Sequence, residues 1–349
     1  MLIAGVGDLV VMKRLVHVRW PPADSLLHVL KEADYVVGNL EVPLTSVDNP
    51  QREDIVLRGD PALIPDVAAL GVDAVSVANN HCGDHGWAAL RGMADELRRS
   101  GVTPLGIGGN LGEALAPVGR QVSGTSLALV CATCVGLEQY LATDDRPGMA
   151  GVRVTTSYGP DEGRLAWEPA TTPPRIHTVV KTEDEARLLG AVSRARELAP
   201  AVVAVVHWGV SWADRPEGYQ RELGHKLVES GACAVLGCHS HTVQGVEVHR
   251  GAPIFYGLGS FVFGYEGPIA ARMPRDSAIA LLDVAPSGRV TRARLLLGRL
   301  DGDGEPVRSH PERAALLAEI VARNSVGWGA PAHLDTDTLT IGGLSGGRD

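Results

Sequence analysis

The segment AVVAVVHWGVSW, Ala201–Trp212, begins with six apolar residues and turns polar at His207. A strand buried on both faces reads as a continuous apolar run, so this segment predicts a central strand of a layered α/β fold. Similar short runs occur elsewhere along the chain, at Leu2–Val6, Tyr35–Gly38, Ala74–Ala78, Leu127–Cys131 and Ala234–Gly237.

Amphipathic segments lie between these runs and predict helices. They are Pro61–Leu70, Trp87–Ser100, Glu183–Leu198 and Gly218–Ser230. From Ala252 the pattern changes to short apolar runs with Gly and Pro turns, which we expect to form a second sheet packed on the first. These later runs are Ile254–Tyr256, Phe261–Phe263, Ala278–Val284 and Val290–Leu297.

The 349 residues fit one large domain, and we expect it to span residues 1–341. Four prolines in the segment 158–181 predict a loop or hairpin insertion there. The glycine-rich end, residues 342–349, is expected to be a flexible tail.

Composition excludes several classes of protein. The net charge of −9 argues against a nucleic-acid-binding protein. No apolar run approaches the ~18–20 residues of a membrane helix, and the start of the chain lacks the pattern of a signal peptide. Five cysteines are an odd number and favour a reducing compartment. The expectation is a cytoplasmic protein without a membrane or nucleic-acid partner.

Polar residues gather just past the predicted strand ends, where open α/β sheets place their sites. Carboxylate, amide and imidazole groups that converge from separate strands are typical of a divalent-cation site with open positions for substrate. The residues in question are Asp8, Asn39, Glu41, Asn80, His81, His207, His239 and His241.

Each of these residues has a plainer interpretation. Asp8 alone has the character of a helix N-cap, Glu41 of a solvated loop acid, and Asn80 of a turn residue. The pair His239 and His241 is the most specific signal, because period-two histidines at a strand end seldom lack a function. The combination favours a metal or polar active site.

Several motifs, in order along the chain, resemble the CapA family, which is associated with poly-γ-glutamate capsule synthesis and is similar to calcineurin-like metallophosphoesterases. The resemblance implies a four-layer αββα sandwich of two mixed sheets. It also implies that Asp8, Asn80, His207, His239 and His241 correspond to metal ligands and His81 to an acid histidine. The motifs are GDLVVMKR (Gly7–Arg14), GNLEVPLT (Gly38–Thr45), GVDAVSVANNHCGDHG (Gly71–Gly86), HWGVSW (His207–Trp212), GCHSHTVQGVE (Gly237–Glu247) and PIFYGLGSFVFG (Pro253–Gly264).

Two departures from the metallophosphoesterase pattern bear on the metal. Val10 stands where that pattern has a histidine, and Asn39 where it has a bridging aspartate, with Glu41 two residues later. Two cations ~3.5–4 Å apart repel strongly and need an anionic bridge. We therefore expect one divalent ion per chain, Ca²⁺, Mg²⁺ or Mn²⁺, held by residues that include Asn39 and Glu41.

Two carboxylate–imidazole pairs remain for acid–base chemistry: Asp8 with His239 or His241, and His81 with Asp84. Such pairs on opposite sides of a substrate carbon suit removal and return of a proton α to a carbonyl. The lasso-peptide epimerase branch of the CapA family is understood to act in this way on a C-terminal residue. The favoured hypothesis is therefore a metal-dependent peptide epimerase.

Four further residues are candidate substrate contacts. Trp208 and Trp212 are expected either to wall a pocket or to pack against the neighbouring sheet. Arg14 and Arg58 are expected to receive a substrate carboxylate, with solvated surface charge as the alternative.

Two other functions compete with the epimerase hypothesis. One is a metal-dependent hydrolase of phosphoesters or γ-glutamyl amides. The other is a non-catalytic protein that binds polyglutamate during its synthesis. The number of metal ions per chain separates the first two: one ion favours proton transfer, and two ions favour hydrolysis.

Overall fold

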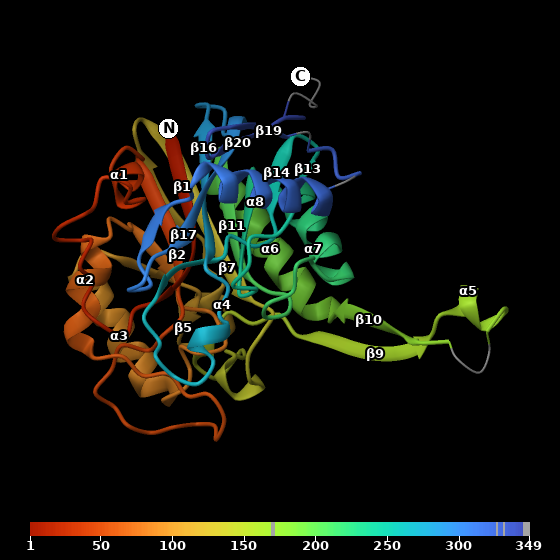
Figure 1. Cartoon of the computed structure of the whole chain (residues 1–349). Coiled ribbons are helices and arrows are strands. Elements are labelled where there is room, and N and C mark those ends of the chain that lie inside the picture. Colours follow the sequence, from red (N-terminus) through yellow and green to blue (C-terminus); the bar gives the residue numbers. More distant parts are fainter. Residues whose placement is uncertain (169–171, 326, 331, 345–349) are drawn as a thin grey trace.

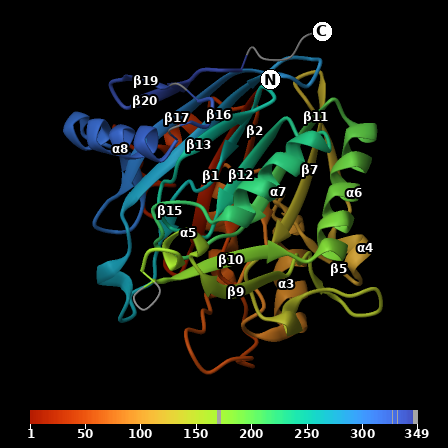
Figure 2. The ribbon, with the colours of Figure 1, turned by 90° about the vertical axis from the view of Figure 1, so that its right-hand side faces the viewer.

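The computed structural model describes residues 1–168, 172–325, 327–330 and 332–344. Two large mixed β-sheets pack against each other, with helices on the outer side of each (Figures 1 and 2). Gly5 shows how close the sheets come: a Cβ atom there would lie 2.6 Å from the Leu236 Cδ1 atom of the facing sheet. The α/β fold with two packed sheets is confirmed.

The first sheet contains ten strands in the order β19-β20-β17-β16-β1-β2-β3-β4, with β15 paired to β1 and β18 to β17. Strands β1 to β4 are parallel, and β16 and β17 are antiparallel to their neighbours. The bounds are β1 Leu2–Val10, β2 Tyr35–Leu40, β3 Ala74–Ser76, β4 Thr103–Leu105, β15 Ser260–Phe263, β16 Asp276–Val284, β17 Val290–Leu300, β18 Pro306–Arg308, β19 Ala332–Asp335 and β20 Thr338–Ile341.

The second sheet contains six strands in the order β13-β14-β12-β11-β7-β6. Its four inner strands, β14, β12, β11 and β7, are parallel, so their carboxyl ends meet at one edge. The bounds are β6 Val118–Val122, β7 Thr125–Thr133, β11 Ala201–His207, β12 Ala234–Cys238, β13 Val246–His249 and β14 Ala252–Phe255. Two short strands, β5 (Ile107–Gly108) and β8 (Gly148–Met149), pair separately.

Helices cover the outer faces (Figure 1). On the first sheet lie α2 (Ile64–Ala69), which the 3₁₀ turn η1 (Pro61–Leu63) precedes, and α3 (Gly86–Arg99). On the second sheet lie α6 (Thr182–Leu198) and α7 (Gly218–Glu229). These four helices occupy the segments that the sequence predicts. Other helical segments are α1 Leu27–Leu30, α4 Leu111–Ala114, η2 Glu138–Tyr140, η3 Ala270–Arg272 and α8 Pro311–Asn324.

The prediction that the strands after Ala252 form the second sheet is wrong. Only β14 lies in the six-stranded sheet, whereas β15, β16 and β17 extend the sheet of β1. Residues Leu2–Val6 pair with Ile279–Asp283, although the two segments are more than 270 positions apart in the sequence. The apolar pattern of a segment predicts that it is a strand but does not specify its partner.

Strand β1 is also longer than predicted. It continues to Val10, so Asp8 lies within the strand rather than beyond its end. Its pairing with β15 shifts register between Asp8 and Leu9, which marks an irregularity beside Asp8. Gly7 permits the close approach there, since a Cβ atom at this position would clash with the carbonyl oxygen of Gly259.

The insertion is a projecting hairpin of β9 (Val154–Pro160) and β10 (Pro174–Val180), with α5 (Glu162–Leu165) near its tip (Figure 1). It begins four residues before the predicted boundary. Tyr158 and Trp167 are exposed on it. Of the expected tail, residues 345–349 lie outside the described residues. Among the described residues, no helix has both the length and the apolar character required to span a bilayer.

Candidate metal and acid–base site

Four buried polar side chains from both sheets meet at the carboxyl ends of the central strands. Asp8 lies in β1, and Glu41 directly follows β2 of the same sheet. His207 ends β11, and His239 directly follows β12 of the other sheet. All four side chains are at least 95% buried. The site therefore lies at the junction of the two sheets.

Asp8 is the most heavily contacted acid of the site. Its carboxylate accepts hydrogen bonds from the Asn39 side chain at 2.8 Å and from the backbone N–H of His239 at 3.1 Å. The Nδ1 atom of His241 lies 3.2 Å from its Oδ2 atom. Burial raises the pKa of Asp8, but His241, His207 and Asn39 together lower it to about 2. Asp8 is thus an ionised carboxylate.

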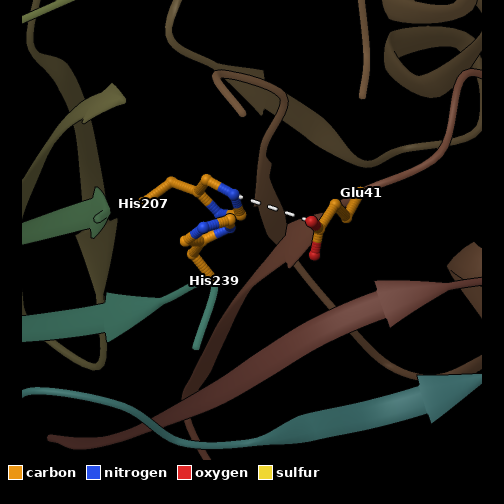
Figure 3. A group of neighbouring side chains, drawn as sticks. All are labelled: Glu41, His207 and His239. Atoms are coloured by element: carbon orange, nitrogen blue, oxygen red, sulfur yellow. Dashed lines mark ion pairs between the residues drawn. The ribbon is translucent and has the colours of Figure 1, made fainter. Parts of the chain in front are cut away.

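Glu41 is buried, and neither of its carboxyl oxygens has a hydrogen-bond partner among the described residues. Its Oε1 atom lies 3.6 Å from His207 Nε2 and 3.8 Å from His241 Nε2. A dashed line marks the first of these two ion pairs in Figure 3. Burial, followed by the charge of Asp8, raises the pKa of Glu41 well above its ordinary value. A buried carboxyl group without donors is costly unless a cation compensates it.

The donor geometry around Glu41 fits a metal ion. Ligand atoms of Glu41, His207 and His239 lie within 4.8 Å of one another, and so do those of Asp8, Glu41 and His241. Burial lowers the pKa of His207 well below its ordinary value and that of His239 to about 3. Both imidazoles are therefore neutral, the form that binds a metal.

His239 and His241 both have left-handed backbone conformations, with φ angles of 94° and 54°. Such conformations cost roughly 1–3 kcal/mol for a residue with a side chain and tend to occur at functional sites. The turn after β12 thus directs both rings towards Asp8 and Glu41. Both histidines of the period-two pair therefore have a strained backbone conformation.

A second acid–base pair lies in the loop after β3. His81 Nδ1 is 2.8 Å from Asp84 Oδ2, and Asp84 is fully buried. The same carboxylate oxygen accepts a hydrogen bond from the backbone N–H of Leu57. Asn79 fixes the start of this loop, because its side-chain oxygen accepts hydrogen bonds from the backbone N–H groups of His81 and Cys82.

A cavity of about 280 Å³ opens at this site. Glu41, Asn80, His81 and His241 form part of its wall, so both predicted acid–base pairs present an imidazole to one space. Arg52 is the only lysine or arginine among the described lining residues. The remaining lining residues are Ser211 and the apolar or aromatic side chains of Val10, Ile55, Leu57, Trp212, Phe263, Tyr265, Ile269 and Met273.

The two asparagines predicted as ligands occupy different settings. Asn39 donates to Asp8, lies 3.2 Å from His207 Nδ1, and accepts from Asn79. We interpret Asn39 as a residue that positions its neighbours rather than as a ligand. The Oδ1 atom of Asn80 lies 2.7 Å from His207 Nε2, next to the Glu41 group.

Three predicted substrate contacts lie away from this cavity. Arg14 is engaged by Asp66 at 2.9 Å, and Arg58 lies 3.5 Å from Asp48, so neither lines the cavity. Trp208 is fully buried and donates to the carbonyl oxygen of Tyr256, which places it in the core of the second sheet. Trp212 does line the cavity and is 42% exposed.

Arg52, rather than Arg14 or Arg58, is the arginine that lines the cavity. It pairs with Asp54, lies 3.7 Å from Asp84, and donates to the backbone carbonyl of Asn80. It belongs to an irregular loop without strand or helix periodicity, so only its charge distinguishes it in the sequence. Apolar Ile269 and Met273 likewise give no local signal that they face a site.

Solved structures with related shapes match weakly. A hypothetical protein from Thermus thermophilus has a TM-score of 0.42 at 18% identity, over 88% of this chain and 96% of that one. A putative 5'-nucleotidase from Staphylococcus aureus, in complex with alpha-ketoglutarate, has a TM-score of 0.47 at 12% identity, over 92% of this chain and 58% of that one.

Curated relatives are similar over most of this chain. The capsule biosynthesis protein CapA of Bacillus anthracis is 26% identical over 85% of it, and the PGA biosynthesis protein CapA of Bacillus subtilis is 26% identical over 76%. A probable polyglutamine synthesis accessory protein of Mycobacterium tuberculosis is 28% identical over 71%. The matches span 66%, 63% and 61% of these relatives, just under two thirds of their length.

The family profile described as bacterial capsule synthesis protein PGA_cap matches residues 3–265. That range contains every strand end that contributes to the site, from Asp8 to His241. It also includes Phe263 and Tyr265 of the cavity wall. The chain therefore belongs to the PGA_cap family of bacterial capsule synthesis proteins.

Proposed function

We propose that this chain is a metal-dependent enzyme that epimerises the α-carbon of one residue in a peptide substrate. The favoured target is the C-terminal residue. One observation carries the proposal: His81 and His241, each paired with a buried carboxylate, line the same cavity. Inversion at an α-carbon requires one group that removes the proton from one face and a second group that returns a proton to the opposite face.

The pairing of each ring supports this role. In both histidines Nδ1 faces the carboxylate, which leaves Nε2 as the atom that exchanges a proton with substrate. In one direction the neutral imidazole of one residue takes the α-proton, and the protonated imidazole of the other supplies a proton to the opposite face. The C–H bond broken is replaced by a C–H bond of inverted configuration, without net gain or loss of protons.

Glu41, His207 and His239 are the residues that would hold the cation in this proposal. A divalent cation there supplies a Lewis acid that stabilises negative charge on the substrate carbonyl. His241 then remains free of metal and acts with Asp8 as an acid–base pair. The ion is Ca²⁺, Mg²⁺ or Mn²⁺ in this proposal.

A metal-dependent hydrolase is the second candidate, because Glu41 belongs to both groups of potential ligands. With two cations, Glu41 would be the shared anion between them and His241 a ligand. A histidine that binds a metal through its free nitrogen cannot also transfer a proton. Elemental analysis therefore separates the two functions: one ion per chain supports the epimerase, and two ions support the hydrolase.

Polyglutamate binding without catalysis is the third candidate, since relatives are named for capsule or polyglutamine synthesis. The cavity favours it least. Most of its described lining is apolar or aromatic, and Arg52 alone supplies positive charge. An apolar pocket with one cation suits an apolar residue with one carboxylate better than a polyanion.

The direct test uses peptides that end in an L- or D-apolar residue, incubated with the protein in D₂O. We expect deuterium at the α-carbon of the terminal residue together with inversion, measured by mass spectrometry and chiral analysis. His81→Ala and His241→Ala should each abolish inversion. Each should still exchange the α-hydrogen of only one epimer, and the two variants should prefer opposite epimers.

His225→Ala is the matched control, because His225 also pairs with a carboxylate, that of Glu247, but does not line the cavity. It should leave inversion unchanged. Absence of α-exchange by the native, metal-loaded protein on peptides of either configuration would refute the proposal. Chelator-sensitive turnover of a generic phosphodiester would favour the hydrolase instead.

A further inference from the structure

A second hollow lies beside the cavity. Its volume is about 370 Å³, and it shares Phe263, Tyr265 and Met273 with the cavity wall. Between the two spaces runs the segment that contains η3 (Ala270–Arg272). Ile269 of this segment lines the cavity, and Ala271 lines the hollow. The two spaces therefore adjoin and share part of their walls, and together they are called the cleft.

An aromatic surface connects the acid–base site to the hollow. The rings of His241 and Phe263 pack edge-on with their centroids 6.1 Å apart. The rings of Phe263 and Tyr265 pack in the same way with their centroids 6.2 Å apart. This surface leads from His241, one of the two proposed acid–base residues, to the second space. A substrate longer than one residue meets Phe263 and Tyr265 as it leaves the cavity in this direction.

The charged side chains that line the hollow balance one another: two are cationic, Lys13 and Arg275, and two are anionic, Glu266 and Asp303. Lys13 lies 3.7 Å from Glu266 and 3.6 Å from Asp303. Arg275 donates to the backbone carbonyls of Leu300 and Asp301. A phosphate or a polyglutamate chain would need an excess of positive charge, which the described lining of the hollow does not offer. Donors and acceptors in equal supply suit the backbone of a neutral peptide.

We propose that this hollow binds the peptide segment that precedes the residue in the cavity, so that the substrate is a peptide of several residues with largely neutral side chains. The inference rests on the proposed function for its placement of the terminal residue next to His81 and His241. It adds a binding subsite formed by the η3 segment on one side and the turn at Gly302 on the other.

The test places a bulky side chain on each of two opposite walls of the hollow, so that less space remains for a peptide. A Cβ atom at Gly302 meets no atom of the described residues within 4 Å, and Ala271 is exposed, so a tryptophan at either position is compatible with the fold. The variants are Gly302→Trp and Ala271→Trp. The matched control is Gly119→Trp, because Gly119 has equal space but lies in β6, outside the cleft.

Two probes are compared by isothermal titration calorimetry with the Mn²⁺-loaded protein: the dipeptide Ala-Phe and a neutral eight-residue peptide with the same end. We expect the longer peptide to bind at least about tenfold more tightly to the native protein, a difference of ~1.4 kcal/mol. Gly302→Trp and Ala271→Trp should remove this advantage and leave dipeptide binding unchanged. Gly119→Trp should preserve it.

Equal affinity of the two peptides for the native protein would overturn the subsite, and so would tryptophan variants that weaken both peptides alike. If the longer peptide binds in the predicted way but shows no α-exchange in D₂O, the subsite stands and the epimerase function fails. If the dipeptide exchanges and length has no effect, the epimerase stands and the subsite fails.

Discussion

Glu41 is the residue on which the metal assignment depends most. Among the described residues its two oxygens have no hydrogen-bond partner, although ligand atoms of three imidazoles lie near them. A protein that never held a cation would gain stability by replacing this carboxylate with a neutral group. The buried, unpartnered carboxyl group therefore supports the proposed cation site.

Glu41→Gln is predicted to abolish metal binding without loss of fold. Elemental analysis should find less than about a tenth of the native metal content, because the anion common to both ligand groups is gone. The metal-free variant should unfold at a temperature no lower than that of the metal-free native protein, since a buried carboxyl group without hydrogen-bond partners among the described residues has been replaced by a neutral amide.

Glu305→Gln is the control for this substitution. Glu305 is as buried as Glu41, but its oxygens accept hydrogen bonds from the backbone N–H groups of Val16 and His17. This variant should lose stability, by about 1–3 kcal/mol in chemical denaturation, and keep its metal. Metal loss in both variants would show that Glu41 has no special role.

Arg52 is predicted to recognise a substrate carboxylate. Its partner Asp54 is 66% exposed, so that ion pair contributes little, about 0–1 kcal/mol, and a substrate anion competes with it readily. Arg52→Gln should weaken binding of a peptide with a free carboxyl end roughly 10- to 100-fold and hardly affect the C-terminal amide. Arg58→Gln should affect neither. Equal weakening of acid and amide would indicate that Arg52 acts through Asp84 instead.

A site residue can be predicted from the sequence when it stands at the end of a recognisable strand. His207 and Glu41 stand where an apolar run ends, so their convergence is expected from topology alone. Arg52 lies in an irregular loop, and nothing local separates its charge from that of Arg58. The difference between the two arginines depends on the path of that loop, which long-range packing decides.

Among the elements, α6 is tied to the base of the projecting hairpin by Asp184. This carboxylate lies in the first turn of the helix and accepts hydrogen bonds from the backbone and guanidinium groups of Arg153. Burial raises the pKa of Asp184, but Arg153 outweighs burial, and the pKa in the folded protein is lowered. The contact therefore holds both the helix start and the entry to β9.

Asp184→Asn is predicted to cost about 1–3 kcal/mol in the free energy of unfolding at pH 7. Because the folded-state pKa is depressed, the stabilisation is complete above the unfolded-state value of ~3.9 and disappears as pH falls through the folded-state value. Urea denaturation of both proteins at several pH values measures this difference. A gap between the variants that stays constant below pH ~3 would contradict the role of the charge.

Strand and helix positions follow from local patterns, whereas sheet membership does not. The runs at Ala201–His207 and Gly218–Ser230 are recovered within a residue as β11 and α7. The partnership of β1 with β16 joins residues more than 270 positions apart and has no local signature. The register shift beside Asp8, where Gly7 packs against the carbonyl oxygen of Gly259, has no local signature either.

For the whole molecule, the site joins the two sheets. Glu41 and Asp8 belong to the ten-stranded sheet, and His207 and His239 to the six-stranded sheet. A cation held by Glu41, His207 and His239 is therefore a crosslink across the sandwich. The binding energy of such a cation would stabilise the packing of the two sheets as well as the local loops.

Metal removal is accordingly predicted to destabilise the whole fold. A cation at about 100 times its Kd contributes ~2.7 kcal/mol, so a chelator should lower the Tm of the native protein by about 5 °C, measured by circular dichroism. In Glu41→Gln the same chelator should change the Tm by less than about 1 °C, because no cation is bound. Because the crosslink couples both sheets, the native transition should remain single and shift as a unit. A chelator effect of equal size in both proteins would place the stabilising cation elsewhere, and a transition that splits in two would mean that the site holds only one sheet.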